Sequence, residues 1–327
     1  MNLSLKLSFR ILQISCQFRL PSTFWFIIAD NAVKIATKMT PVEKKRIPEW
    51  FKVSKGKLRA TRKLSTVLDR EVPDTICQEA RCPNRSECFT KGLLTFMILG
   101  VTCTRNCAFC SVTHGTPLPP DKSELSRILH AIKYLNLRFV VLTSPNRDDL
   151  EDGGAGHYAY IVSEIKKAFP NVKVEVLIPD FQGKEADLAC VIASEPDVLN
   201  HNIETVPSLY GVARKGSVYR RSLEVLRSSK HIQPNILTKS GLMVGLGESK
   251  EELLQTFQDI RSAGVDILTI GQYLKPDKNN LDVARYYTPD EFESLKKEAE
   301  KMGFAHVFSG PLVRSSYLAE HVFDKAS

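Results

Sequence analysis

Short apolar runs alternate with longer amphipathic segments along most of this 327-residue chain. Apolar runs of roughly four to eight residues are typical of buried strands, and apolar positions recurring every three to four residues are typical of helices. The strand candidates are residues 94–99, 139–143, 172–178, 198–201, 237–244, 267–271 and 306–309. The helix candidates are residues 122–135, 155–168, 186–194, 220–229, 250–263 and 289–302.

This order of elements predicts the α/β class. Strands that alternate with helices form a parallel sheet with right-handed crossovers. A closed barrel of this kind needs eight strand–helix units, and the chain offers about six. We therefore expect a partial (β/α)6 TIM-type barrel that is open on one side, with its active-site groups on the loops that follow the strands.

Composition and charge restrict the class of partner. The charged fraction is 25% and the hydrophobic fraction 43%, which is ordinary for a soluble globular protein. Of the net charge of +8, residues 1–38 contribute +4, with five basic residues and one acidic residue. No long basic run follows, and no apolar run approaches the roughly 20 residues of a membrane span. We expect neither a nucleic-acid partner nor a membrane association.

The N-terminal 38 residues are basic, poor in acidic residues and apolar at positions 24–28. No small-residue cleavage site follows a clean apolar core, so the segment does not indicate a secretory signal. Two interpretations remain open, an organelle transit peptide and an extension that precedes a natural start at Met39. The polar stretch after Met39 favours the second. In either case we expect residues 1–47 to be a flexible or mis-assigned extension.

Six of the eight cysteines fall between positions 77 and 110 and form two triplets. The first has the spacing C-x4-C-x5-C and the second C-x3-C-x2-C; their members are Cys77, Cys82 and Cys88, then Cys103, Cys107 and Cys110. A disulfide scaffold is not expected in a chain that is long enough to bury a large core. Zinc remains an alternative, although its sites usually pair two C-x2-C units. Three thiolates also suit a 4Fe–4S cluster, whose fourth iron is then open to another ligand.

The second triplet resembles the signature of the radical S-adenosylmethionine enzymes, and the first triplet narrows the resemblance to the lipoyl synthases. Five further runs are similar to the same family: RDDLEDGG at 147–154, NHNIET at 200–205, TKSGLMVGLGE at 238–248, TIGQYL at 269–274 and RSSY at 314–317. The resemblance extends from about Pro48 to Val322. One C-x3-C-x2-C motif identifies only the superfamily, whereas the two triplets with the terminal RSSY are highly specific.

The resemblance implies that the cluster on Cys103, Cys107 and Cys110 chelates S-adenosylmethionine through its open iron. Reductive cleavage of this cofactor then gives a 5′-deoxyadenosyl radical that removes hydrogen from an unactivated C–H bond. Five residues are candidate cofactor contacts: Phe109, Gly153, Gly154, Asn202 and Glu204. A packed aromatic ring and a tight Asp/Gly turn are the structural alternatives for Phe109 and the two glycines. No side chain beyond the cluster ligands is expected to be catalytic.

The resemblance also implies a second, auxiliary 4Fe–4S cluster on Cys77, Cys82 and Cys88. Its fourth ligand is then a serine of the RSSY run, Ser316 by preference and Ser315 otherwise. A serine oxygen binds iron less tightly than a thiolate, which suits a cluster that gives up sulfide. The expected divisions are an auxiliary-cluster extension at 48–93, a radical barrel at 94–312 and a cluster-capping segment at 313–327.

A sulfurtransferase activity follows from the resemblance. The enzyme inserts two sulfur atoms, at C6 and C8, into an octanoyl chain on a carrier lysine, giving lipoyl-lysine. It uses two molecules of S-adenosylmethionine and sulfur from the auxiliary cluster. A biotin-synthase-like or methylthiotransferase-like sulfur inserter is the alternative enzyme, and an electron carrier is the non-enzymatic one.

Several partners are implied as well. They are octanoylated carrier domains (E2 of 2-oxoacid dehydrogenases and the H protein of glycine cleavage), an electron donor such as ferredoxin or flavodoxin, and a cluster-repair donor. We expect a cytoplasmic location, or an organelle matrix if residues 1–38 are a transit peptide.

Four other residues carry expectations of their own. His201 has no evident partner for catalysis, so we interpret it as a structural histidine. Cys190 lies in an apolar helical pattern, so we expect it in the core. Lys239 and Arg221 are candidate contacts to the carrier domain.

Overall fold

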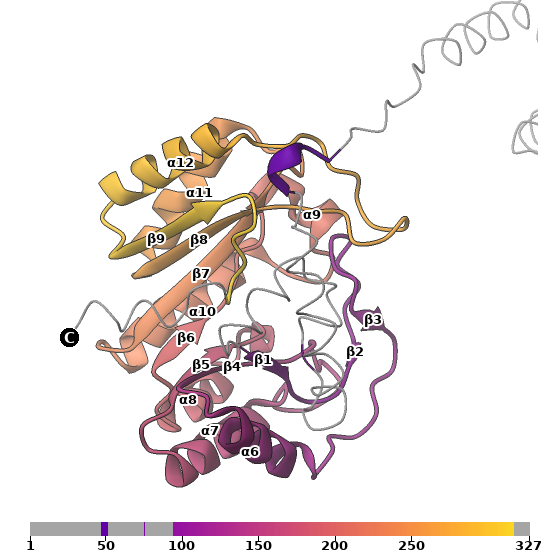
Figure 1. The fold of residues 1–327 in the computed structure, drawn as a ribbon, viewed down its shortest axis with the longest axis vertical. Helices are drawn as coiled ribbons and strands as arrows, with labels where there is room; N and C mark the ends of the chain where they lie inside the picture. The colour runs from indigo at the N-terminus through magenta and orange to yellow at the C-terminus, as the bar shows by residue number, and fades with distance from the viewer. Residues whose placement is uncertain (1–46, 52–74, 76–93, 317–327) are drawn as a thin grey trace, which may run out of the picture. The chain divides into compact units, whose positions relative to one another are not determined.

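The computed structural model describes residues 47–51, 75 and 94–316 (Figure 1). The chain divides into the units Met1–Ile47 and Pro48–Ser327, and every described residue except Ile47 belongs to the second. The triplet Cys77, Cys82 and Cys88 lies outside the described residues, as does Tyr317. The expected divisions after residues 93 and 312 therefore stay predictions.

A seven-stranded parallel sheet forms the frame of the second unit (Figure 1). Its strands follow chain order, with each strand paired to the next: β1 (Leu94–Met97), β4 (Phe139–Thr143), β5 (Lys173–Leu177), β6 (Val198–Asn200), β7 (Leu237–Val244), β8 (Ile267–Gln272) and β9 (His306–Gly310). No ladder joins β1 to β9 among the described residues, so the sheet is not closed. Six strand–helix units followed by a last strand confirm the predicted partial barrel.

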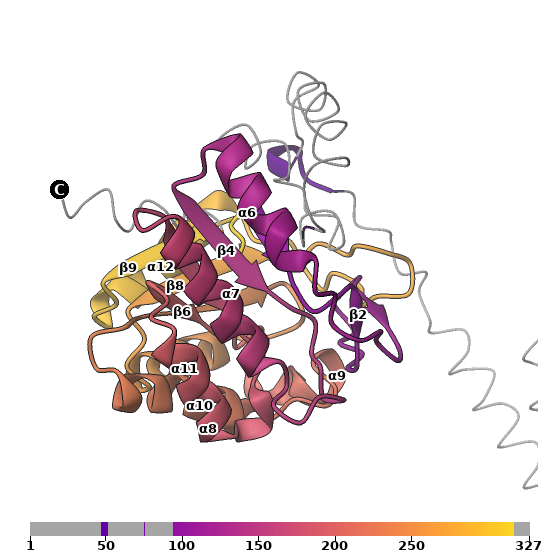
Figure 2. The ribbon, with the colours of Figure 1, turned by 90° about the horizontal axis from the view of Figure 1, so that it is seen from below.

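The crossover helices cover the outer face of the sheet. They are α6 (Glu124–Leu135), α7 (Ala155–Ala168), α8 (Glu185–Ala193), α10 (Tyr219–Ile232), α11 (Lys250–Ser262) and α12 (Pro289–Lys301). As Figure 2 shows, α6, α7 and α8 lie side by side in chain order. Two buried apolar clusters fill the space between the helices and the strands. Capping boxes at Ser249 and Thr288 fix where α11 and α12 begin.

Alternate side chains on each strand point to opposite faces of the sheet. Phe96 and Leu142 pack with the outer helices. Thr95, Met97 and Thr143, their neighbours along β1 and β4, line the interior of the barrel instead. Because both faces are covered, β1 and β4 are buried throughout, which is why they appear in the sequence as short apolar runs.

The first strand ends two residues earlier than predicted. Leu99 and Gly100 both adopt a positive φ, so the chain turns out of the sheet there. Their amides donate to the buried carboxylate of Glu124 at 3.0 and 3.1 Å instead of to a neighbouring strand. His157 contacts the same carboxylate at 2.8 Å. This turn directs the chain into the cysteine loop.

Several short elements were not predicted from the sequence. They are η1 (Glu49–Phe51), β2 (Thr102–Cys103), β3 (Thr113–His114), η2 (Phe181–Gly183), η3 (Pro207–Leu209) and α9 (Tyr210–Ala213). β2 and β3 pair in parallel and enclose the cysteine loop. None of the helices in the described part of the chain has the length and apolar character that a membrane crossing requires.

Candidate active site

A cavity of about 510 Å³ occupies the barrel interior at the carboxyl ends of the strands. This position is where barrel enzymes place their active sites. Among the described residues, the lining comes from the cysteine loop, the inner faces of β1, β7 and β8, the loops after β4, β5, β6 and β8, and the segment 313–316. Cys103, Cys107 and Cys110 lie together on one wall.

Hydrogen bonds made by its backbone hold the cysteine loop to three other loops of the rim, two of them to backbone groups and one to the Asn280 side chain. Thr104 donates to the carbonyl of Asn146, after β4, at 3.0 Å. Ala108 donates to the carbonyl of Ala213, at the end of α9, at 2.9 Å. Asn280, from the loop after β8, donates to the Cys110 carbonyl at 2.8 Å. The loop is therefore fixed from both sides of the cavity mouth.

A buried guanidinium ties the same loop to two strands. Arg105 lies between the first two cysteines of the motif. It forms bidentate ion pairs with Asp148, after β4, and with Asp180, after β5, at 2.7–2.9 Å. Burial alone would raise the pKa of Asp180, but the hydrogen bonds and charge of Arg105 hold that pKa well below its usual range. Asp180 is therefore ionised at neutral pH and holds the cysteine loop in place.

The three thiols fit a cluster better than a single ion. Among the described residues, no three His, Cys, Asp or Glu side chains converge closely enough to share one metal ion. Cluster thiolates bind different irons and need no such convergence. Burial raises the pKa of Cys107 to about 12 and that of Cys110 to about 11, so the thiolate forms require a strong positive charge, such as iron, beside them.

Two backbone amides point at the sulfur atoms. The amide of Arg105 donates to Sγ of Cys103 at 3.4 Å, and that of Val112 donates to Sγ of Cys110 at 3.5 Å. Hydrogen bonds to the sulfurs are one of the factors that set the reduction potential of an iron–sulfur cluster. The loop thus supplies backbone donors to two of its three thiols, those of Cys103 and Cys110.

A polar wall faces the cysteine loop. Asn202 donates to Oε1 of Glu204 at 3.0 Å. Arg214 lines the same cavity and donates to the hydroxyls of Tyr210 and Ser222 at 2.9 and 3.0 Å. Burial raises the pKa of Glu204, and the charge of Arg214 and the Asn202 hydrogen bond oppose that rise. The wall therefore presents a guanidinium and an acidic side chain to a ligand that carries amino and carboxylate groups.

The segment 313–316 closes another side of the cavity. It packs on Gly271 of β8, where an added Cβ would lie 2.1 Å from the carbonyl oxygen of Val313. Ser315 donates to Oδ1 of Asn202 at 2.8 Å and accepts from Nδ2 of Asn200 at 2.8 Å. The Ser316 hydroxyl lines the cavity and has no hydrogen-bond partner among the described residues.

Comparison with known proteins identifies the chemistry of this site. A family model described as the Radical SAM superfamily matches residues 97–260. A lipoyl synthase of Thiobacillus denitrificans is 46% identical over 293 residues, covering 89% of this chain and 94% of that protein. A lipoyl synthase of Histophilus somni is 51% identical over 278 residues, covering 84% and 86%.

The chain belongs to the lipoyl synthase family of radical SAM enzymes. Among solved structures, SuiB of Streptococcus suis bound to its precursor peptide SuiA aligns with a TM-score of 0.53 at 11% identity, covering 88% of this chain and 62% of that one. At this identity the likeness shows the fold alone. The radical SAM domain accounts for the partial barrel and implies a 4Fe–4S cluster and S-adenosylmethionine.

The cofactor contacts expected by resemblance to lipoyl synthases separate into two groups. Phe109, Asn202 and Glu204 line the main cavity with the three cysteines. Gly153 and Gly154 do not line it. Gly154 begins α7 against Leu99, where an added Cβ would lie 2.3 Å from the leucine side chain. Its positive φ and this packing together favour a glycine at this position without any ligand, and the cofactor contact of the two glycines stays a prediction.

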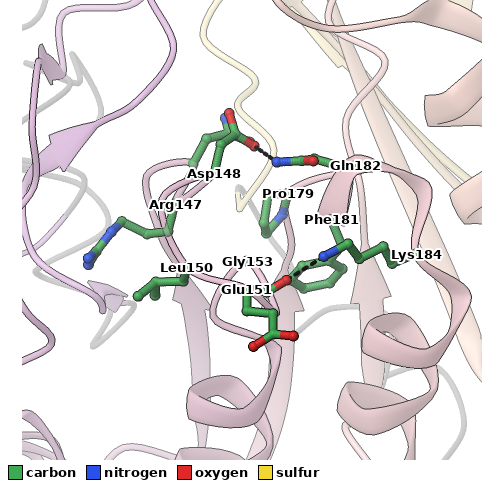
Figure 3. A pocket seen from close by; sticks show the side chains of 10 residues that line it. Arg147, Asp148, Leu150, Glu151, Gly153, Pro179, Phe181, Gln182 and Lys184 are labelled. Carbon is green, nitrogen blue, oxygen red and sulfur yellow. Dashed lines mark hydrogen bonds between the residues drawn. The ribbon is translucent and has the colours of Figure 1, made fainter.

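Figure 3 shows the small hollow beside Gly153. Its volume is about 10 Å³, enough for roughly one water molecule. Asp148 and Gln182 are hydrogen-bonded across one side of it at 3.2 Å, and Lys184 donates to the carbonyl of Glu151 on the other. This hollow joins the loops after β4 and β5 and is too small for a cofactor.

Three side expectations have clear outcomes. His201 is confirmed as structural, because its buried ring bonds to the Ile178 carbonyl and the Ser222 hydroxyl at 2.9 and 3.0 Å. The core placement of Cys190 was wrong, since this residue is exposed on α8. Lys239 was also wrong as a carrier contact, because it is 1% exposed and pairs with buried Glu175 at 3.1 Å. Arg221 stays a prediction.

Sequence reasoning missed the residues that organise the site. Asp180 pairs with Arg105 across 75 positions, and Arg214 faces Glu204 from a separate loop. A charged residue inside the cysteine motif was the one available signal, because a buried arginine needs a carboxylate partner. Nothing in the local pattern marked Asp180 or Arg214.

Proposed function

We propose that this chain inserts two sulfur atoms, at C6 and C8, into an octanoyl chain attached to a carrier lysine. Family membership makes it a radical SAM sulfurtransferase. The observation that carries the finer proposal is one cavity shared by the three radical-motif cysteines and the terminal serine segment. A single enclosed space allows hydrogen removal and sulfur insertion at the same carbon.

Cys103, Cys107 and Cys110 would hold the radical cluster. When bound, the cluster and S-adenosylmethionine together supply the homolytic removal of hydrogen from an unactivated C–H bond. The loop contributes fixed geometry, since Arg105 and the backbone bonds to Asn146 and Ala213 hold the thiols against the cavity. Such preorganisation limits the movement needed to reach the reactive arrangement.

The polar wall suits the cofactor. The Arg214 cation and the Glu204 carboxylate offer partners to the carboxylate and to the amino or hydroxyl groups of S-adenosylmethionine. Asn202 holds Glu204 in place through its side-chain amide. Phe109 lies inside the cysteine motif and lines the cavity, where it can shield the cluster and an adenine edge from water.

The apolar part of the lining suits an acyl chain. Met97, Leu177, Met243, Leu274 and Val313 all border the cavity. Its volume of about 510 Å³ lies within the range of small-ligand sites. An octanoyl chain is flexible and apolar, so burying it here removes its surface from water. We propose lipoyl carrier domains, E2 of 2-oxoacid dehydrogenases and the glycine-cleavage H protein, as the proteins that present this chain.

The auxiliary cluster would use Cys77, Cys82 and Cys88 with Ser316. Thr75, two positions before Cys77, is buried and pairs with Phe96 of the edge strand β1. Thr75 itself is thus anchored to the sheet that bounds the cavity. Ser316 has an unengaged hydroxyl at the cavity wall, whereas Ser315 already has two partners. This contrast supports Ser316 as the iron ligand.

The chemistry calls for accessory proteins. An electron donor such as ferredoxin or flavodoxin would reduce the radical cluster, and a repair donor would restore sulfide after each turnover. Six cysteines that must remain reduced call for a reducing compartment, so we propose the cytoplasm, or an organelle matrix if residues 1–38 direct it there.

Counting iron and sulfide tests the two-cluster proposal. The reconstituted chain should contain about eight irons and eight sulfides, since each cubane has four of each. Cys82→Ala should retain about four and still cleave S-adenosylmethionine, with no thiolated product. A chain with about four irons before substitution, or a Cys82→Ala variant that still makes lipoyl product, would refute the auxiliary cluster.

A further inference from the structure

A line of buried and part-buried hydrogen bonds crosses the barrel interior and ends at the cofactor wall. It begins with the ion pair of Lys239 and Glu175, both at most 1% exposed. Asn200, on β6, donates through Nδ2 to Oε1 of Glu175 at 2.7 Å and to Oγ of Ser315 at 2.8 Å. Ser315 then donates to Asn202, and Asn202 donates to Glu204.

The direction of every bond in this line follows from its ends. A carboxylate only accepts hydrogen bonds, so Glu175 requires the NH2 group of Asn200 to face it. The same NH2 group donates to Ser315, whose single proton is then left for Oδ1 of Asn202. With its oxygen engaged, Asn202 has only its NH2 group to offer to Glu204.

We propose that Ser315 is a positioning residue for S-adenosylmethionine. Its hydroxyl fixes the side-chain amide of Asn202, and through it the carboxylate of Glu204 at the cavity wall. This role rests on the proposed function, in which Asn202 and Glu204 contact the cofactor. The neighbouring serines of the terminal run then have different roles, Ser316 with the auxiliary cluster and Ser315 with the cofactor.

The same contacts disfavour Ser315 as an iron ligand. Binding iron as an alkoxide would remove the proton that Ser315 gives to Asn202, leaving that amide free to turn. Ser316 has no such commitment among the described residues. The segment 313–316 also packs tightly on Gly271. In this docked position, Ser315 reaches between Asn200 and Asn202 and completes the cofactor wall.

The test measures cofactor binding without turnover. Equilibrium dialysis of S-adenosylmethionine against anaerobically reconstituted, unreduced enzyme gives Kd for the wild type, Ser315→Ala, Ser315→Thr and Ser316→Ala. We expect Ser315→Ala to weaken binding roughly tenfold, the effect of losing one well-made hydrogen bond. Ser315→Thr keeps the hydroxyl and should restore most of the affinity. Ser316→Ala should bind as tightly as the wild type.

Iron counting and electron paramagnetic resonance complete the experiment. Ser315→Ala should retain its iron, and its reduced radical cluster should need more S-adenosylmethionine for the same spectral change. An unchanged Kd in Ser315→Ala, an equal loss in Ser316→Ala, or loss of auxiliary iron in Ser315→Ala would each overturn the positioning role. A wild-type chain that does not bind S-adenosylmethionine would overturn the proposed function itself, and this inference with it.

Discussion

Removing the guanidinium of Arg105 is the substitution with the largest expected effect outside the cysteines. The Arg105→Gln side chain keeps much of the length but loses the charge and the paired donors. Asp180, whose side chain is fully buried, then keeps Arg221, at 3.3 Å, as its cationic partner within the described part of the chain. The cysteine loop loses its ion pairs to the loops after β4 and β5, and the Thr104 hydroxyl still donates to the Asn146 carbonyl at 3.0 Å.

The size of the expected loss of stability follows from the burial of Arg105, Asp148 and Asp180. Breaking a buried ion pair by removing one member costs about 3–5 kcal/mol. Arg221 still pairs with Asp180, which reduces the cost of leaving that carboxylate without Arg105. Asp148 is 30% exposed, so solvent weakens its ion pair with Arg105 and that pair contributes less to stability. We therefore expect the free energy of unfolding to fall by about 3 kcal/mol, which lowers the melting temperature by about 6 °C for a chain of this size.

Thermal unfolding of the reconstituted protein under anaerobic conditions measures this effect, with iron content measured on the same samples. We expect Arg105→Gln to lose iron from the radical site as well as stability. The double variant Arg105→Gln/Asp180→Asn should recover part of the stability, because it leaves no unpaired buried charge. Arg127→Gln is the matched control, since its pair with Asp121 is about half exposed.

The outcome that contradicts this reasoning is specific. An Arg105→Gln protein that melts within about 2 °C of the wild type and keeps all its iron would show that the buried network does not anchor the loop. A double variant less stable than Arg105→Gln alone would show that the unpaired charge of Asp180 is not the cause of the loss.

Three further predictions concern other parts of the site. Cys107→Ala leaves two thiolates for the radical cluster and should abolish 5′-deoxyadenosine formation; wild-type amounts by chromatography would contradict the assignment. Gly271→Ala places a Cβ 2.1 Å from the Val313 carbonyl and should displace the terminal segment, lowering both melting temperature and product. Burial lowers the pKa of His201 to about 4, so the unfolded state binds its proton first as pH falls below about 6.5. The unfolding free energy should fall by about 2 kcal/mol between pH 7 and pH 5, and His201→Gln should lose this dependence.

Hydrophobic patterning predicted the regular elements well because nearly every strand is buried on both faces. β4 (Phe139–Thr143) and β7 (Leu237–Val244) have the predicted bounds, and the remaining barrel strands differ by one or two residues at their ends. The short β2 and β3 strands have no such pattern. They depend on contacts of the cysteine loop, such as the bond from Gly115 to the Cys103 carbonyl, which the local sequence does not reveal.

The motifs predicted which residues gather at the rim but not what fixes them. Cys103, Asn202 and Glu204 come together because the carboxyl ends of parallel strands share one edge of a sheet. Lys239 was misassigned because a charged residue on a strand normally faces solvent, whereas here it points into a polar barrel interior. Pairings such as Ser315 with Asn202, 113 positions apart, require the three-dimensional fold.

One anaerobic turnover tests the central claim most directly. The reconstituted chain is mixed with an octanoyl-lysine peptide, S-adenosylmethionine and a chemical reductant, and the products are examined by mass spectrometry. The account predicts two molecules of 5′-deoxyadenosine for each peptide that gains two sulfur atoms. Cleavage of S-adenosylmethionine with no sulfur added to the peptide, or sulfur added without 5′-deoxyadenosine, would contradict it.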